Sequence, residues 1–342
     1  MSGRSFLRRF AVAAGFAAFA WIPVCAVGQS ASKPIPIRMS TQPQPSWLQY
    51  TAKELGLFEK VGLAPTYLKF LAGVQLIGAV QGNSLDIATP GVSPFSAGLA
   101  QGLNWRVVGW DDTVPFGEGF VARADTNIKT LEDLKGRTVG VTRGSTSYYG
   151  LIAALRSKGI SRNDVKLLIL DPPGQLAALQ NKNIDAAAVW QPWIEKMKTD
   201  VGARLIGMEG DYGVYTAVAV IAVREQFLKE NPEAVKRYLT AMVMAYDHIK
   251  KNGPAVTIKA VAEAMNVSES VAATIYKQTI PDDPRLWIRS DYQFSMLKSG
   301  KYLKQLQDMA DLLHEDQILK SKVDVSSAID PSYITEVLKS HP

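Results

Sequence analysis

The chain has 342 residues, of which 47% are hydrophobic and 20% are charged, and its formal net charge is +6 at pH 7. This composition excludes a disordered chain, and the weak charge, without a Lys/Arg stripe interleaved with aromatic residues, gives no support for a nucleic-acid partner. The single cysteine, Cys25, excludes an internal disulfide, a thiolate zinc site and Cys-x-x-Cys redox chemistry. The length predicts about two domains.

The first residues predict a targeting segment. Three arginines precede an apolar stretch at residues 10–27, which Pro23 interrupts and small residues follow. This order is typical of a cleavable secretory signal, which we assign to residues 1–28. A single membrane-spanning anchor is the alternative. Cleavage would remove Cys25 and the three arginines, which lowers the net charge to +3 and gives an exported chain without a thiol.

Short apolar runs alternate with helical patterns over the first two thirds of the chain. Strands are predicted at residues 35–40, 85–88, 105–109, 138–142, 165–170, 185–190 and 216–223. Helices are predicted at residues 47–55, 75–81, 95–101, 147–158 and 175–181, and from residue 225 onward the pattern is helical almost to the end. Strands separated by helices of this length favour βαβ crossovers and a mostly parallel sheet.

Two stretches of the chain resemble each other at an offset of 99 residues. Residues 79–88 and 178–187 align without gaps, and each runs from a helix end through a polar turn to an Asp that opens a short buried strand. Chance similarity between two βαβ units is one explanation. The other is a pair of lobes of the same architecture, whose strand-end loops would face each other across a ligand-binding cleft.

Most enzyme signatures are missing from the sequence. The three histidines are isolated, and there is no Gly-x-Ser-x-Gly elbow and no phosphate-binding Gly-Lys-Ser/Thr loop. Residues 117–122 match the dinucleotide fingerprint formally, but an extended segment follows them where a helix is required. We therefore expect no catalytic residue, no metal ion and no cofactor.

The candidate site residues lie in loops that suit a small anion. Gly144, Ser145, Thr146 and Ser147 stand between a predicted strand and a predicted helix, where first-turn N–H groups and hydroxyls can hold a sulfonate, carboxylate or phosphate. Ordinary N-capping by Ser145 or Ser147 is the alternative. Similar helix starts and neutral donors in the front half are offered by Gln42, Gln44, Ser46, Gly73, Val74, Gln75, Gly91, Val92 and Ser93.

Aromatic and acidic residues complete the candidate site. Trp190, Gln191 and Trp193 follow a predicted strand, and the indoles either form a ligand wall or pack between the lobes. A cleft that pairs an anion-binding helix start with a carboxylate or an indole face would select a zwitterion with an ammonium group. Three carboxylates in glycine-containing loops could serve there or be merely solvated: Asp111, Glu118 and Asp211.

Seven motifs spread over the chain form a recognisable set. They are KELGLFEKVGL at 53–63, DIATPG at 86–91, DLKGRTVGV at 133–141, GST at 144–146, LDPP at 170–173, AALQNKNID at 177–185 and VWQP at 189–192. Together they resemble the signature of periplasmic solute-binding proteins of ABC importers for taurine, alkanesulfonates and nitrate.

The resemblance implies an α/β fold of the two-lobed, type II periplasmic binding protein class. Each lobe would be a mixed, mostly parallel sheet flanked by helices, with the ligand in the cleft between the lobes. Lobe I would comprise residues 34–120 plus 217–342 and lobe II residues 121–216. The chain would cross between them near residues 120–123 and 217–223.

The resemblance also implies a function. A small-molecule ligand, with taurine or another sulfonate favoured, would close the lobes of a periplasmic monomer, which would then dock on the membrane permease of an ABC transporter. Residues 111–116 and the doubled tryptophan at 190–193 depart from the taurine-binding pattern and leave room for a larger or aromatic ligand. Two alternatives stay open: a ligand-presenting sensor, and an enzyme similar to thiamine-pyrimidine synthases, which a mature chain without cysteine disfavours.

Overall fold

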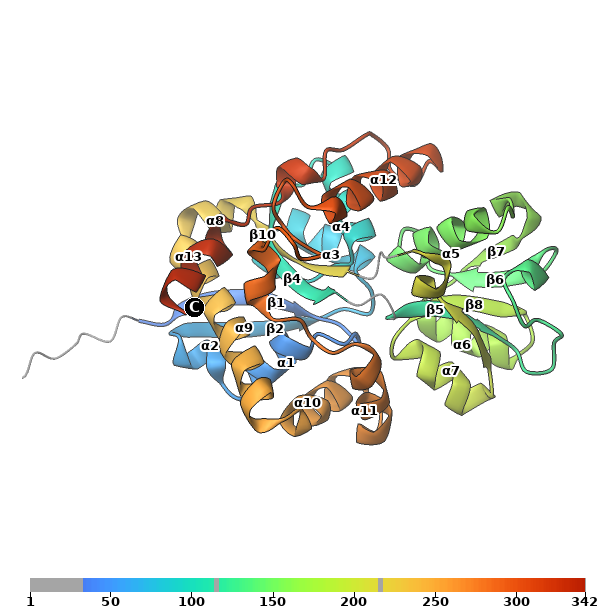
Figure 1. Cartoon of the computed structure of the whole chain (residues 1–342), viewed down its shortest axis with the longest axis horizontal. Helices are drawn as coiled ribbons and strands as arrows, with labels where there is room; N and C mark the ends of the chain where they lie inside the picture. The colour runs from blue at the N-terminus through green and yellow to red at the C-terminus, as the bar shows by residue number, and fades with distance from the viewer. Residues whose placement is uncertain (1–32, 114–116, 215–217, 342) are drawn as a thin grey trace, which may run out of the picture. The chain divides into compact units, whose positions relative to one another are not determined.

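The computed structural model describes residues 33–113, 117–214 and 218–341, so the expected signal at residues 1–28, with Cys25, lies outside the described residues. Residues 34–342 form one compact unit. Its described strands form two five-stranded mixed sheets, each flanked by helices (Figure 1). No helix in the described part of the chain is long and apolar enough to cross a membrane.

The first sheet has the strand order β2-β1-β3-β10-β4. Its strands are β1 (Ile35–Thr41), β2 (Leu63–Lys69), β3 (Ile87–Ala88), β4 (Trp105–Thr113) and β10 (Val218–Arg224). β1 pairs in parallel with β2 and β3, whereas β10 pairs antiparallel with β3 and β4. One face is covered by α1 (Trp47–Glu54), α2 (Leu57–Lys60) and α9 (Pro232–Asn252), and the other by α3 (Val74–Gln81) and α4 (Val92–Ala100) (Figure 1).

The second sheet repeats this plan with the order β7-β6-β8-β5-β9. Its strands are β5 (Glu118–Ala122), β6 (Thr138–Val141), β7 (Lys166–Ile169), β8 (Ala186–Trp190) and β9 (Arg204–Met208). β6 pairs in parallel with β7 and β8, and β5 pairs antiparallel with β8 and β9. α5 (Thr146–Ser157) covers one face, and α6 (Pro172–Gln180) and α7 (Trp193–Val201) cover the other (Figure 1).

The remaining helices follow β10 and pack around the first sheet. They are α8 (Glu225–Glu230), α10 (Ala255–Met265), α11 (Glu269–Gln278), α12 (Lys301–Glu315) and α13 (Ser332–Ser340). α10 packs on α1, and α13 packs on α9 and β4. α12 contacts both α4 and α5, so it touches a helix of each sheet.

The switch between the sheets differs from the expected position. β5 pairs with β8 along its whole length, from Glu118 to Ala122, so the chain has joined the second sheet before residue 120 and does not cross at residues 120–123. Glu118 and Gly119 open β5, and neither residue type favours a strand, which explains why the sequence did not reveal it. The return to the first sheet is complete at Val218, the first residue of β10.

In each sheet, a carboxylate just before the central strand, β3 or β8, accepts hydrogen bonds from a neighbouring strand. Asp86 accepts hydrogen bonds from the backbone N–H of Arg38 at 2.9 Å and from the Arg38 and Arg224 side chains. At the matching place in the second sheet, Asp185 accepts one from the backbone N–H of Thr138 at 3.0 Å. The two aligned stretches therefore play the same structural role, which favours two lobes of one architecture over chance similarity.

We expect Asp86→Ala to destabilise the protein more than Asp185→Ala. The Asp86 side chain is 4% exposed and is shared by two arginines, whereas that of Asp185 is 24% exposed and lies 3.9 Å from Arg123. Removing one partner of a buried ion pair costs about 3 kcal/mol or more, and an exposed pair contributes about 0–1 kcal/mol. Both variants lose one strand N–H partner, so urea unfolding followed by circular dichroism compares them directly. Equal losses would contradict this assignment.

Candidate ligand-binding site

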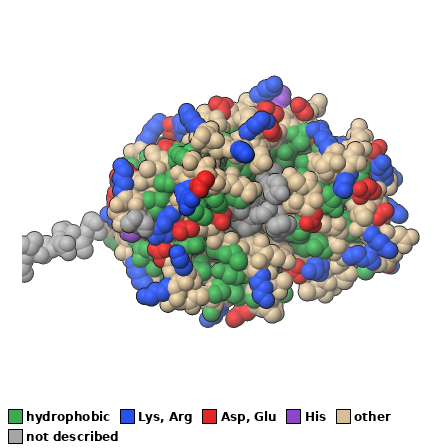
Figure 2. Space-filling view, viewed as in Figure 1, with side chains coloured by type: hydrophobic (Ala, Val, Ile, Leu, Met, Phe, Trp, Pro, Cys, Tyr) green, Lys and Arg blue, Asp and Glu red, His purple; other side chains and the backbone are tan. Residues whose placement is uncertain are grey.

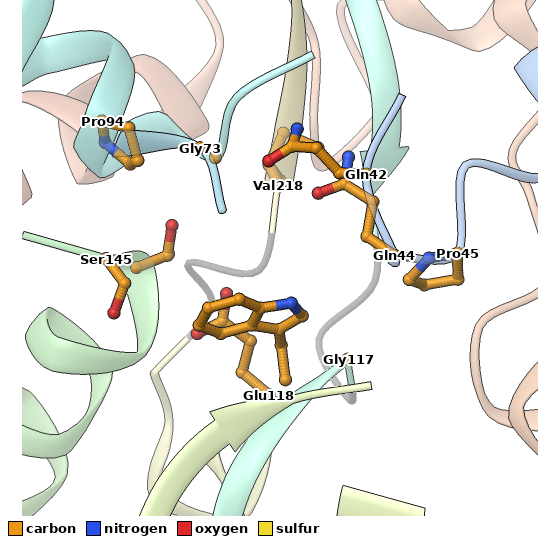
Figure 3. A pocket seen from close by; sticks show the side chains of 13 residues that line it. Gln42, Gln44, Pro45, Gly73, Pro94, Gly117, Glu118, Ser145 and Val218 are labelled. Atoms are coloured by element: carbon orange, nitrogen blue, oxygen red, sulfur yellow. The ribbon is translucent and has the colours of Figure 1, made fainter. Parts of the chain in front are cut away.

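The ends of several strands and the starts of several helices meet at one pocket (Figure 3). The pocket has a volume of about 560 Å³, which includes space open to solvent. It is lined by residues of both sheets: Gln42, Gln44, Pro45, Gly73, Gly91, Pro94, Gly117, Glu118, Ser145, Thr146, Trp190, Val218 and Ala219.

The start of α5 forms one wall. The Ser145 hydroxyl accepts a hydrogen bond from the Tyr148 backbone N–H at 3.1 Å and donates to the Thr142 carbonyl at 2.7 Å, so Ser145 is the N-cap of α5. Ser147 is buried and lies 3.0 Å from the Ser145 hydroxyl. Thr146 lines the pocket, and its hydroxyl has no hydrogen-bond partner in the described part of the chain. N-capping is therefore confirmed for Ser145, and Thr146 offers the hydroxyl that is available to a ligand.

The first sheet contributes the opposite wall. The amide nitrogens of Gln42 and Gln44 both donate to the Thr89 carbonyl, at 2.7 and 3.1 Å. Gly91 immediately precedes α4. It lies so close to Thr146 that a Cβ atom at position 91 would collide with the Thr146 hydroxyl. A side chain at position 91 would thus block the approach of the two helix starts. The starts of α4 and α5 consequently face each other at the pocket.

Two hydrogen bonds connect the elements of the two sheets beside the pocket. The Ser93 hydroxyl donates to the Gly144 carbonyl at 3.0 Å, and the Gln191 amide nitrogen donates to the Gln278 side-chain oxygen at 3.2 Å. Ser93 and Gln191 are both buried. The sequence suggested Ser93, Gly144 and Gln191 as ligand contacts. In the structure they connect the two halves and do not line the pocket.

The pocket wall carries one acid and no base. Glu118 faces Trp190 in the pairing of β5 with β8, and both residues line the pocket. No Lys or Arg lines it among the described residues, and Figure 2 shows basic and acidic side chains interspersed over the face in view. An anion would be held there by helix starts and neutral donors, and an ammonium group by Glu118 and the Trp190 indole.

The other sequence-predicted residues do not line this pocket. Val92 is fully buried in α4, and Val74 follows Gly73 at the start of α3. Asp211 is exposed, and its carboxylate accepts a hydrogen bond from the Met208 backbone N–H at 2.8 Å, so it caps a turn. Gln75 and Trp193 line a second pocket.

Five pocket residues were not expected from the sequence: Pro45, Pro94, Gly117, Val218 and Ala219. They shape the wall with small or apolar groups and carry no distinctive chemistry. Only Gly117 had a visible signal, since the Gly117-Glu118-Gly119 pattern marks a place where the backbone can approach closely.

Asp111 is a buried acid behind the pocket wall. It was expected in a loop but lies in β4, where its Oδ2 accepts hydrogen bonds from the Ser46 hydroxyl and, at 3.2 Å, from the Gln44 amide. Its Oδ1 is buried without a partner among the described residues. Burial raises the pKa of Asp111 to about 7, although the bonds from Ser46 and Gln44 lower it. Burial also raises the pKa of the nearby Tyr50, and the Asp111 charge adds to that shift, so the phenol stays neutral.

We expect ionisation of Asp111 to destabilise the folded protein. Its pKa is raised from 3.8 to about 7, so the folded state holds this proton more tightly than the unfolded chain. The free energy of unfolding therefore falls as the pH rises from about 4 to about 7, by up to about 4 kcal/mol.

The variant Asp111→Asn should lose this pH dependence and be more stable than the wild type at pH 8. Urea titrations of both proteins at pH 5 and pH 8 measure the difference. An unchanged slope in the variant would show that another group is responsible. Asp86→Asn is a useful contrast: burial raises the pKa of Asp86, but the hydrogen bonds from Arg38 and Arg224 help to bring it below its usual value.

Comparison with known proteins agrees with this architecture. A family model described as "NMT1/THI5 like" matches residues 47–255, more than half of the chain. The chain belongs to the NMT1/THI5-like family. The match begins at the first residue of α1 and ends at the first residue of α10, so it includes the starts of α4 and α5.

Relatives of known name are binding proteins. The taurine-binding periplasmic protein of Escherichia coli (strain K12) is 31% identical over 186 residues, which cover 54% of this chain and 57% of that protein. A Bacillus subtilis (strain 168) protein, provisionally named an aliphatic sulfonates-binding protein, is 25% identical over 298 residues, 85% of this chain and 84% of that protein.

Solved structures share the fold. The alkanesulfonate-binding protein SsuA from Xanthomonas axonopodis pv. citri, bound to MOPS, has a TM-score of 0.74 and 25% identity and covers 87% of this chain and 99% of its own. The desulfurization enzyme DSZB has a TM-score of 0.65 and 19% identity, with 90% of this chain and 100% of its own covered. The fold is thus that of two-lobed periplasmic binding proteins, as the sequence predicted, and the fold by itself does not separate binding from catalysis.

Proposed function

We propose that this protein is the extracytoplasmic substrate-binding component of an ABC import system. It captures a small organic anion or zwitterion, taurine or another sulfonate foremost, by closure of its lobes and delivers it as a monomer to a membrane permease. The observation that carries the proposal is the meeting of the α4 and α5 helix starts at one pocket lined by neutral donors. The names of the relatives support the same ligand class and the same location.

The pocket suits a sulfonate for a physical reason. A sulfonate carries one negative charge spread over three oxygens, each of which accepts hydrogen bonds. The first-turn N–H groups of α4 and α5, the Thr146 hydroxyl and the second N–H of the Gln42 amide supply donors at this pocket, whereas the Gln44 amide already donates to Thr89 and Asp111. The helix dipoles favour a negative charge at this place, so no lysine or arginine is needed.

A zwitterion such as taurine also has a partner for its ammonium group. Glu118 supplies a carboxylate and Trp190 an indole face, and the two are opposite each other on paired strands. A cation between them gains both an ion pair and a cation–π contact. The pocket therefore accommodates both ends of an aminosulfonate.

We infer that the protein is not an enzyme, although DSZB shares its fold. The described residues include no cluster of three or more His, Cys, Asp or Glu that could hold a metal ion. The Ser145 hydroxyl is already bonded to Thr142, Ser147 and Tyr148, and no basic side chain lies among its partners. A nucleophilic serine requires such a base. A sensor would use the same pocket, and solute uptake after deletion of the permease separates sensing from import.

We expect Thr146→Val to weaken sulfonate binding at least about tenfold. The substitution removes one donor to a charged group, worth about 1.5–3 kcal/mol, and keeps the side chain's shape. Ser145→Ala is less informative, since it also removes the N-cap of α5. Isothermal titration with taurine and with ethanesulfonate measures the loss.

The matched control is Thr274→Val. The Thr274 hydroxyl donates to the Ser270 carbonyl at 3.1 Å on the exposed side of α11 and does not line the pocket. Its substitution should leave both dissociation constants unchanged. If Thr146→Val bound both sulfonates as tightly as the control, the start of α5 would not be part of the binding site.

A further inference from the structure

A second, larger pocket adjoins the first. It has a volume of about 1390 Å³, including space open to solvent, and its lining includes strands of the first sheet and the helix α7 that covers the second. Its apolar lining includes Phe70 and Leu71 from the turn between β2 and α3, Trp193 at the start of α7, and Met265 at the end of α10. No residue of this pocket except Gln42 also lines the first one.

The two pockets are neighbours along three separate segments. Gln42, after β1, lines both of them. At the start of α3, Gly73 lines the first pocket and Gln75 the second. At the end of β8, Trp190 lines the first pocket, and three residues later Trp193 lines the second. The same three connections therefore contribute to both pockets, which places the pockets next to each other.

An exposed leucine marks the second pocket. Leu71 is 49% exposed, and it is one of five large hydrophobic side chains that are exposed among the described residues. The other four line neither pocket. A single exposed leucine is ordinary, but Leu71 stands beside Phe70 in a concave, two-sided wall, where an apolar group would be covered on binding.

The charges around the second pocket suit an anionic ligand. Lys53, Lys69 and Lys196 line it together with Glu54 and Glu263. In the described part of the chain, neither Lys69 nor Lys196 forms an ion pair, so their charges are not neutralised by a neighbour. A small excess of positive charge at such a wall attracts an anion toward the binding site.

We propose that the ligand is a sulfonate with an aromatic or extended apolar tail. Its sulfonate group lies in the first pocket, at the starts of α4 and α5, and its tail lies in the second pocket against Phe70, Leu71 and Trp193. This inference rests on the proposed function and narrows its ligand class. A short hydrophilic ligand would leave the apolar wall of the second pocket uncovered, whereas a tailed sulfonate buries it.

The test compares two probes that share a head group. Ethanesulfonate fills only the first pocket, and 3-phenylpropane-1-sulfonate adds a ring on a short chain. Isothermal titration of the full chain should show the phenyl compound binding at least about tenfold more tightly, since burial of a ring adds apolar contact. In Leu71→Ser this advantage should fall to about twofold or less, with the ethanesulfonate dissociation constant unchanged.

Leu205→Ser is the matched control, because Leu205 is an exposed leucine of β9, 38% exposed, that lines neither pocket. It should keep the full advantage of the phenyl compound. Thermal unfolding of both variants checks that each is folded. Equal binding of the two probes, or an advantage that survives Leu71→Ser, overturns the inference and leaves the proposed function standing. Failure of both probes to bind overturns the proposed function and the inference with it.

Discussion

Parallel pairing of β1 with β3 and of β6 with β8 is the constraint on which the site depends. Parallel strands end at the same edge of a sheet, so the helices that follow them start at that edge as well. The antiparallel strands β5 and β10 run the other way and begin there, and their first residues, Glu118 and Val218, line the pocket. The first residues of the strands that open each return between the sheets therefore lie at the pocket.

Carboxylates at the two ends of the sheets differ in how well their negative charge is satisfied. Asp86 and Asp185 lie at the far ends, where arginines and strand N–H groups satisfy them. Asp111 lies behind the pocket, and one of its oxygens has no partner among the described residues, so its ionisation is unfavourable. The favourable charge pairs thus hold the scaffold, and the unfavourable group lies beside the binding wall, where it holds the Gln44 amide and Ser46 in place.

The sequence predicted the repeated sheets and the start of α5, since the aligned Asp residues and Ser145 have local signatures. It did not predict β2, β5 or β9. β2 contains Pro65 and alternates only weakly between buried and exposed residues, and β5 opens on a Glu-Gly pair. Val218 and Pro94 line the pocket through their shape, which no sequence pattern announces. The sequence predicts one role for Trp190 and Trp193, but α7 begins at Trp193 and this residue lines the second pocket.

In the proposed binding mode, the residues that recognise the sulfonate group differ from the residues that discriminate among sulfonates. In this binding mode, the helix-start N–H groups, Thr146 and Gln42 contact the sulfonate group alone, so they would bind every sulfonate by the same interactions. Specificity is a difference between affinities, and groups common to all competitors contribute nothing to it. Discrimination among sulfonates has to arise where the ligands differ, which is beyond the head group. In the proposed binding mode, Glu118 and Trp190 would distinguish ligands with an ammonium group, and the wall of Phe70, Leu71 and Trp193 would distinguish them by the size and polarity of the tail.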